Sequence, residues 1–276
     1  SKRKPDSKDL ENIDLILFDL QDVGVRFYTY LSTLHYVMES CAENNIEIIV
    51  LDRPNPNANY IDGPVLKENS KSFVGLHPVP ILYGLTIGEY AKMINGEKWL
   101  NNKIQAKLTV IKMDNYKREY RYQLKSKPSP NLPNLKSINL YPSLCFFEQT
   151  PVSVGRGTEM QFQVIGSPNW NNQPFSFTPR PNFGAKNPKH NGIKCFGLDL
   201  RHEKKLSKIN LGWLIKAYNY SPEKDNFFRS GFYRLAGNKE LEDQIKAGMS
   251  AEDIKLTWKK DIESYKIVRN KYILYN

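Results

Sequence analysis

LILFDLQDVGVRFYTYLSTLHYVMESCAENNIEIIVLD, residues 15–52, is the stretch that decides the fold. Leu15–Phe18 and Ile46–Leu51 are short apolar runs typical of buried strands, and an aspartate follows each run. Between them, Val25 to Asn44 reads as a helix because large apolar residues recur at helical spacing: Phe27, Leu31, Leu34, Met38 and Cys41. Strand, helix and strand in this order predict a parallel α/β sheet.

The same rhythm continues to about the middle of the chain. Val79–Tyr83 and Leu108–Met113 read as further strands. Between them Thr86 opens a helix as a capping box with Glu89, which explains Glu89 without any chemistry, and Gly96 ends it. The first strand comes almost at once and few strands follow, whereas a doubly wound sheet usually carries more. We therefore expect a parallel sheet that is incomplete at its N-terminal side.

The second half has a different pattern, and a polar, proline-rich connector from Ser126 to Pro133 separates it from the first. It offers strand candidates at Gln161–Ile165 and Ile193–Leu200 and three helix signals: Leu211–Tyr218, a start at Ser221-Pro222-Glu223, and Ser250–Tyr275. This mixture indicates a smaller α+β domain. We predict an α/β domain over residues 1–125 and the α+β domain over residues 126–276.

Composition excludes several classes of protein. The net charge of +11 comes from lysines scattered along the chain, which favours a solvated basic surface over nucleic-acid binding and would also suit an anionic wall polymer. No uncharged apolar stretch of about 18 residues is present, so no membrane span is expected. Cys41, Cys145 and Cys195 are too far apart for a metal motif, and no dinucleotide or phosphate-loop motif occurs. We expect neither a metal site formed by these cysteines nor a bound dinucleotide.

A first polar cluster lies at the turn between the first strand and the first helix. Asp22, Arg26 and Tyr28 surround a glycine there. Asp22 either caps the helix and pairs with Arg26, or these side chains form a ligand site. Spacing alone does not separate the two interpretations.

Two further clusters carry candidate binding residues. Arg53 and Asn55 lie in a rigid Arg-Pro-Asn-Pro loop after Asp52, which suits either a sugar or carboxylate clamp or an ordinary proline turn. Glu148 follows Phe146 and Phe147, surroundings that would desolvate its carboxyl and suit a general acid. Arg156 stands between two glycines, where the backbone can approach a ligand closely, and a buried Glu148–Arg156 ion pair that braces a loop is the equal alternative.

These clusters carry a resemblance to a known family. The segments FDLQDVGVRFYTYLSTLHYVMES, VLDRPNPN, DGPVL, SFVGLHPVPILYGLTIGEYA, SPNLPNL, YPSLCFFEQTPVSVGRGT and AGMSAEDIKLTWKKDIESYKIVRNKYILY occur in this order from about Asp14 to the C-terminus. Together they resemble the NamZ-like exo-β-N-acetylmuramidases. The ordered succession makes the resemblance specific.

The resemblance implies a Rossmann-like domain followed by a smaller domain that closes a cleft holding the active site. It implies release of N-acetylmuramic acid from the non-reducing ends of peptidoglycan fragments, without a cofactor, in the periplasm or outside the cell. Motif matches place eight residues at the cleft: Asp22, Arg26, Arg53, Asn55, Asn131, Glu148, Arg156 and Thr158. We add Tyr28 from the first cluster as a binding candidate, and an arginine of the set would grip the lactyl carboxylate of the sugar.

One departure from the family bears on catalysis. Members carry a Phe-Gly-Pro-Glu-His-Gly motif, whose glutamate is the favoured catalytic residue, before the point that corresponds to the first residue here. Because glycosidases use two carboxyl groups, we expect Glu148 or Asp22 to supply one and the motif glutamate the other. The first hypothesis is an exo-acting muramidase; the alternative is a muropeptide-binding protein without the chemistry, and an RNA-binding protein is the least favoured.

Overall fold

The computed structural model describes residues 2–120 and 122–275 and divides them into two compact units. The first unit comprises residues 1–122 and 260–276, and the second comprises residues 123–259. The sequence assigned residues 260–276 to the second domain, but they pack in the first unit. Tyr265 there donates a hydrogen bond to the Tyr83 carbonyl (2.6 Å) and Arg269 donates one to the Gly84 carbonyl (2.8 Å).

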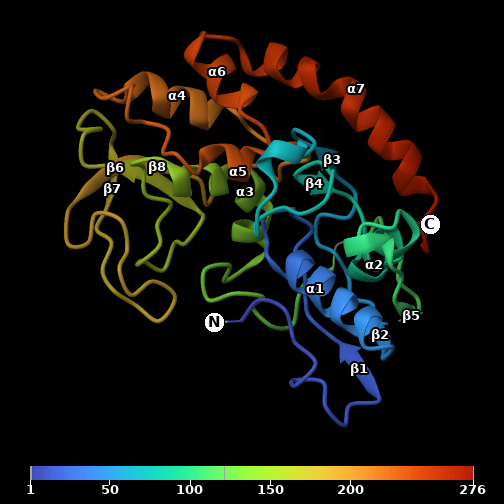
Figure 1. Ribbon diagram of the computed structural model, residues 1–276. Coiled ribbons are helices and arrows are strands. Elements are labelled where there is room, and N and C mark those ends of the chain that lie inside the picture. The colour runs from blue at the N-terminus through green and yellow to red at the C-terminus, as the bar shows by residue number, and fades with distance from the viewer. Residues whose placement is uncertain (1, 121, 276) are drawn as a thin grey trace. The chain divides into compact units, whose positions relative to one another are not determined.

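The first unit is built on a three-stranded parallel sheet in the order β1-β2-β5 (Figure 1). The strands are β1 (Leu15–Phe18), β2 (Glu47–Leu51) and β5 (Lys107–Ile111), with Phe18 level with Val50 and Val50 level with Val110. The predicted parallel α/β sheet is therefore confirmed, and its first strand has the predicted bounds.

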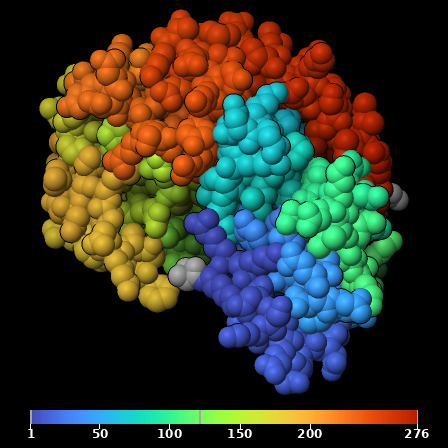
Figure 2. Space-filling model, viewed as in Figure 1, coloured from blue at the N-terminus to red at the C-terminus, as the bar shows by residue number. Residues whose placement is uncertain are grey.

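Helices α1 (Tyr30–Glu43) and α2 (Ile87–Gly96) contact the sheet, and their apolar side chains share one core with Phe18, Ile48 and Val50. Side chains alternate across a strand, so the neighbouring residues of β1 point to the other face. Leu15 and Leu17 there are 42% and 59% exposed. The N-terminal segment lies along α1 on the surface, where Lys4 pairs with Glu39 and Glu43 (Figure 2).

Two predicted elements of the first unit have different bounds for local reasons. The first helix starts at Tyr30 and not at Val25, because Arg26 N donates to the Ile81 carbonyl and Gly24 has a φ of 77°. The strand predicted at Val79–Tyr83 shrinks to β4 (Leu82–Tyr83) and pairs antiparallel with β3 (Ile61–Asp62). Pro78 and Pro80 lack the N–H groups that a ladder needs. Two 3₁₀ turns, Glu68–Ser70 and Asn101–Lys103, complete the unit.

The second unit holds an antiparallel sheet in the order β6-β8-β7, with β6 (Val164–Ser167), β7 (Phe175–Phe177) and β8 (Cys195–Asp199). Before it come α3 (Leu135–Leu144) and the 3₁₀ turn Cys145–Gln149. After it come α4 (Gly212–Tyr220), α5 (Phe232–Ala236) and α6 (Glu240–Lys246). The division between the units falls inside α7 (Ala251–Asn270).

The helix start predicted at Ser221-Pro222-Glu223 is wrong. Ser221 is the residue that ends α4, and its backbone N–H donates to the Ala217 carbonyl. The chain then stays irregular until α5. No helix of the described residues is long and apolar enough to cross a membrane.

Candidate functional site

Asp22 is a buried carboxyl group in the turn that follows β1. Its side chain is 3% exposed, and its Oδ2 accepts hydrogen bonds from the Tyr83 hydroxyl and from Gly24 N (2.5 Å). Oδ1 has no hydrogen-bond partner among the described residues. Burial, partly offset by the bonds from Tyr83 and Gly24, raises the pKa of Asp22 to about 6. A carboxyl with this pKa holds a proton in part of the molecules near neutral pH.

The predicted pairing of Asp22 with Arg26 does not form. Arg26 is 1% exposed and donates to the carbonyls of Pro64 (2.7 Å) and Val79 (2.9 Å), so its guanidinium braces the backbone. Asp22 does not cap α1 either, since Thr29 occupies the cap position. Tyr28 is half-buried and packs edge-on against Tyr30. Burial raises the pKa of Tyr28 above its usual value.

The loop after β2 lies directly against the Asp22 turn. Gln21 donates to the Pro54 carbonyl (2.8 Å) and Asn57 donates to the Val23 carbonyl (2.9 Å). A Cβ at Gly24 would come within 2.1 Å of the Asn55 side chain, so only glycine fits there. The structure thus brings the first two sequence clusters together.

Within that loop, Asn55 and Arg53 differ in accessibility. Asn55 is buried, donates to the Leu85 carbonyl (2.7 Å) and accepts from Asn57 N (2.8 Å), as expected of a residue that shapes a turn. Arg53 is half-exposed, and its Nε donates to Asp19 (2.6 Å). Arg53 is therefore the more accessible of the two predicted binding residues.

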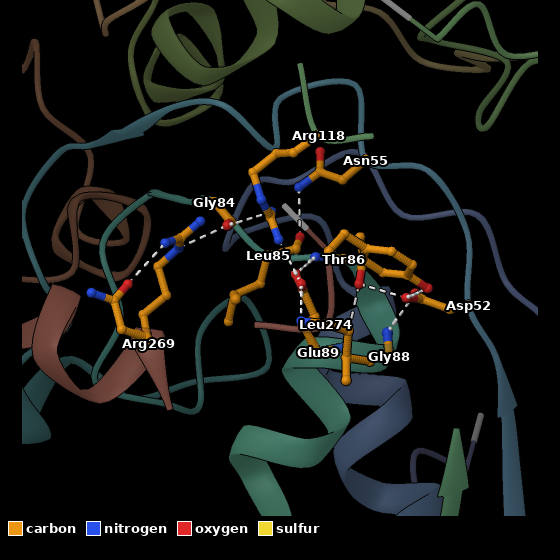
Figure 3. Close-up of polar contacts among 12 residues, drawn as sticks. Asp52, Asn55, Gly84, Leu85, Thr86, Gly88, Glu89, Arg118, Arg269 and Leu274 are labelled. Carbon is orange, nitrogen blue, oxygen red and sulfur yellow. Dashed lines mark hydrogen bonds and ion pairs between the residues drawn. The ribbon is translucent and has the colours of Figure 1, made fainter. Parts of the chain in front are cut away.

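Asp52 joins the loop to the start of α2 (Figure 3). Its Oδ1 accepts from Gly88 N (2.8 Å) and Arg53 N (2.9 Å), and its Oδ2 accepts from the hydroxyls of Thr86 and Tyr275 (2.7 Å each). Burial, the largest cause, raises the pKa of Asp52 despite these four donors. All the acceptor capacity of this carboxyl faces protein groups.

Glu89 is the second carboxylate of the same network. The predicted capping box with Thr86 is confirmed, because Thr86 N donates to Glu89 Oε2 (2.8 Å). Oε1 also accepts from Leu274 N (2.8 Å) and pairs with Arg118 (2.5 Å), as Figure 3 shows. The Glu89 side chain is wholly buried.

The second unit contains an open pocket, which we call the Glu148 pocket. Its volume is about 400 Å³, within the range of small-molecule sites, and it combines one carboxylate with four cationic side chains. The lining residues are Glu148, Ser153, Val154, Arg156, Phe183, Gly184, Ala185, Lys186, Asn187, Pro188, Lys189 and Arg229. Two of the predicted site residues, Glu148 and Arg156, are among them.

Glu148 and Arg156 form an ion pair at the pocket wall. Arg156 Nη1 lies 2.5 Å from Glu148 Oε1, and the side chains are 40% and 30% exposed. Phe146 and Phe147 are buried, but the Glu148 side chain keeps 30% of its surface exposed, so the carboxylate is not enclosed as the sequence suggested. The ion pair expected as an alternative is present, but it opens on the pocket and is not buried.

Asn131 and Thr158 make hydrogen bonds to backbone groups near the pocket. Asn131 Nδ2 and Arg156 Nη2 both donate to the Gly184 carbonyl, at 2.7 and 3.4 Å. Thr158 turns its hydroxyl to the Gly155 carbonyl (2.7 Å), and its own carbonyl accepts from Asn182 (3.4 Å). Both side chains therefore hold the loops that line the pocket, and sugar contact by either stays a prediction.

The sequence did not single out most of the lining residues, among them the aromatic and cationic ones: Phe183, Lys186, Lys189 and Arg229. The Lys189 ammonium group donates hydrogen bonds to several backbone carbonyls of residues 147–152. The nearest are Thr150 O at 2.6 Å and Phe147 O at 2.7 Å, so Lys189 stabilises this segment. Burial lowers the pKa of Lys189 to about 7. The one available signal was a dense polar and aromatic run, residues 180–190, without a regular element.

Among residues 2–120 and 122–275, no three His, Cys, Asp or Glu side chains gather as metal ligands would. The three cysteines are free and buried, as expected for Cys41.

Comparison with known proteins identifies the family. The N-terminal region of the exo-β-N-acetylmuramidase NamZ family matches residues 1–136, and its C-terminal region matches residues 139–275. The peptidoglycan β-N-acetylmuramidase NamZ of Bacillus subtilis (strain 168) is 37% identical over 99% of this chain and 70% of its own length.

Solved structures agree with these matches. A DUF1343 family protein of Bacteroides fragilis NCTC 9343 is 46% identical and superposes with a TM-score of 0.95, over 99% of this chain and 78% of its own. A second protein of that family from the same strain is 30% identical, with a TM-score of 0.82 over the same shares. The chain belongs to the exo-β-N-acetylmuramidase NamZ family.

Proposed function

We propose that this protein is an exo-acting glycoside hydrolase that releases N-acetylmuramic acid from the non-reducing ends of peptidoglycan fragments. The observation that carries the proposal is the match of both family regions, in order, over nearly the whole chain. The identity of 37% to the Bacillus subtilis muramidase supports the same activity. The Glu148 pocket supplies the carboxylate and the cationic groups that an acidic sugar requires.

We assign Glu148 as the carboxylate that faces the substrate. It is the one acidic side chain of its pocket, and its ion pair with Arg156 fixes its orientation while leaving it 30% exposed. In a glycosidase such a group acts as nucleophile or as the base that activates water. Arg156, Asn131 and Thr158 then serve to position it.

Asp22 is the alternative to Glu148 as the carboxyl that works with the glutamate of the Phe-Gly-Pro-Glu-His-Gly motif, and it would then act as a proton-holding carboxyl. Glycosidic oxygen leaves as an alcohol, so a general acid must donate a proton, and a pKa of about 6 suits that task near neutral pH. Oδ1 of Asp22 has no hydrogen-bond partner among the described residues, so it is the oxygen that can carry and donate this proton. Arg53, Asn55, Arg26 and Tyr28 are proposed to shape the surroundings of Asp22 in the first unit.

Peptidoglycan lies outside the cytoplasmic membrane, and we propose a periplasmic or secreted location on that ground. The anionic character of wall polymers agrees with the net charge of +11.

The test is hydrolysis of a chromogenic β-N-acetylmuramide and of the disaccharide N-acetylmuramyl-β-1,4-N-acetylglucosamine, with the products separated by chromatography. We expect free N-acetylmuramic acid from both and no internal cleavage of longer chains. Binding of the sugar without any release would instead identify a muropeptide-binding protein. Release of N-acetylglucosamine from non-reducing ends would contradict the proposal.

A further inference from the structure

The Glu148 pocket holds more positive charge than its own carboxylate can balance. Four cationic side chains line it: Arg156, Lys186, Lys189 and Arg229. Two of them are committed, since Arg156 pairs with Glu148 and Lys189 donates to backbone carbonyls. Lys186 and Arg229 are exposed and have no side-chain hydrogen bond or ion pair among the described residues. Their donors are available to an anionic ligand.

Arg229 is held beside Glu148 by its own backbone. Its N–H donates to the Gln149 carbonyl (2.9 Å), and Gln149 follows Glu148 directly. A Cβ at Gly231 would come within 2.7 Å of Gln149 Oε1, so the turn after Arg229 is closely packed on the same residue. The guanidinium charge also contributes to the lowered pKa of Lys189. The main chain of Arg229 is therefore fixed beside Glu148, and its exposed side chain lines the pocket.

Phe183 presents an aromatic ring at the rim of the pocket. The ring is 93% exposed, which is unusual for so large an apolar side chain. Its turn is pinned on both sides, because Asn182 and Ala185 exchange backbone hydrogen bonds (3.0 and 3.2 Å). The next residue, Gly184, is anchored by Asn131 and Arg156. An exposed ring on a rigid turn is typical of a binding platform and not of a mobile loop.

An exposed aromatic ring beside two cationic side chains without partners in the described part of the chain suits a ligand that has both an apolar ring face and a carboxylate. N-acetylmuramic acid has this composition: it differs from N-acetylglucosamine by a lactyl ether that ends in a carboxylate. We propose that Arg229 and Lys186 bind the lactyl carboxylate of the muramyl residue, while Phe183 packs against the face of the same sugar. The inference rests on the proposed function only for the identity of the sugar.

The experiment compares binding of N-acetylmuramic acid and N-acetylglucosamine to the protein by calorimetry, which needs no turnover. Charge-assisted hydrogen bonds are expected to favour the muramic acid by about 10- to 100-fold. The double substitution Arg229→Ala with Lys186→Ala should remove most of this preference and leave N-acetylglucosamine binding unchanged. Arg229→Lys should restore part of it. Lys208→Ala removes an exposed charge of the same unit outside the pocket and should change neither affinity.

Phe183→Ala should weaken the binding of both sugars equally, by about 2- to 10-fold. The inference is overturned if the double variant keeps the full preference, if it loses both sugars to the same extent, or if the unaltered protein does not distinguish or bind them. Selective binding through Arg229 without hydrolysis would support this inference and refute the proposed function. If the unaltered protein hydrolyses the substrate but the double variant keeps its full preference for N-acetylmuramic acid, the proposed function is supported and this inference is refuted.

Discussion

Two ion pairs of equal length, one in each unit, have opposite surroundings. Arg118 and Glu89 in the first unit meet at 2.5 Å with side chains 12% and 0% exposed, and Arg156 and Glu148 in the second meet at 2.5 Å with side chains 40% and 30% exposed. Glu89 also accepts from two backbone N–H groups, Thr86 and Leu274. Because the N–O distance is the same in both pairs, their roles are set by burial and by the number of other donors that bind each carboxylate.

The buried network is closed and the pocket is open. Both carboxylate oxygens of Asp52 and of Glu89 accept from protein donors, so these carboxylates hold α2, the loop after β2 and the C-terminal residues together. In the Glu148 pocket, the side chains of Lys186 and Arg229 have N–H donors without a partner among the described residues. A network of the first kind contributes stability, and one of the second kind is available to a ligand.

Glu89→Ala should have the largest effect on stability. It leaves the mostly buried Arg118 without its carboxylate, and breaking a buried pair costs about 3–5 kcal/mol. The matched variant Glu148→Ala removes an exposed partner and should cost no more than about 1 kcal/mol. Urea unfolding of both variants gives the comparison. Equal losses would show that burial does not separate the two pairs.

Asp22→Asn should change how stability depends on pH. The folded pKa of about 6 lies above the ordinary value of 3.8, so the contribution of Asp22 is fully present below the unfolded pKa and is lost as the pH rises through about 6. The stability difference between variant and unaltered protein should therefore move by about 3 kcal/mol between pH 3.5 and pH 7.5, in favour of the variant. Urea unfolding across this range measures it.

His35 and His77 act in the opposite direction, because burial lowers both pKa values and stability is lost as the pH falls below about 6.5. They are present in both proteins, so their effect cancels in the difference. A difference that does not change with pH would mean that Asp22 is ionised in the fold as easily as in water.

Asp199→Asn should have the smallest effect. Asp199 pairs with Arg201 at 2.7 Å on the surface of the second unit, away from the Glu148 pocket, with side chains 21% and 44% exposed. Such a pair contributes roughly 0–1 kcal/mol, and screening by salt reduces it further. Thermal unfolding in low and high salt checks this value. A loss above about 2 kcal/mol would place this pair with the buried one.

The strands of the parallel sheet could be predicted from sequence because each is a short apolar run that a polar residue ends. The capping box of α2 was equally local, since Thr86 and Glu89 satisfy each other within one turn. The start of α1 was not local: the backbone of Arg26 is bound to Ile81, far along the chain. The segment Val79–Tyr83 was predicted as a strand from its apolar residues, although Pro78 and Pro80 were a local signal against a longer strand.

The candidate site shows the same limit. Glu148 and Arg156 lie eight residues apart, so their pairing was one of two interpretations that spacing allowed. Phe183 and Arg229 carry no motif, and only the tertiary fold brings them to the pocket that Glu148 lines. Asp22 was found at its strand end, but its burial and its pKa depend on Tyr83, which spacing does not bring near.

The most direct test of the account is the kcat for a chromogenic β-N-acetylmuramide, measured for the unaltered protein, Glu148→Gln and Asp199→Asn. Both variants lose one carboxylate that faces an arginine in the second unit. The account predicts that Glu148→Gln lowers kcat by about 10²- to 10⁴-fold with little change in unfolding midpoint, and that Asp199→Asn leaves kcat unchanged. Full activity in Glu148→Gln would contradict the claim that the chemistry lies in the open pocket.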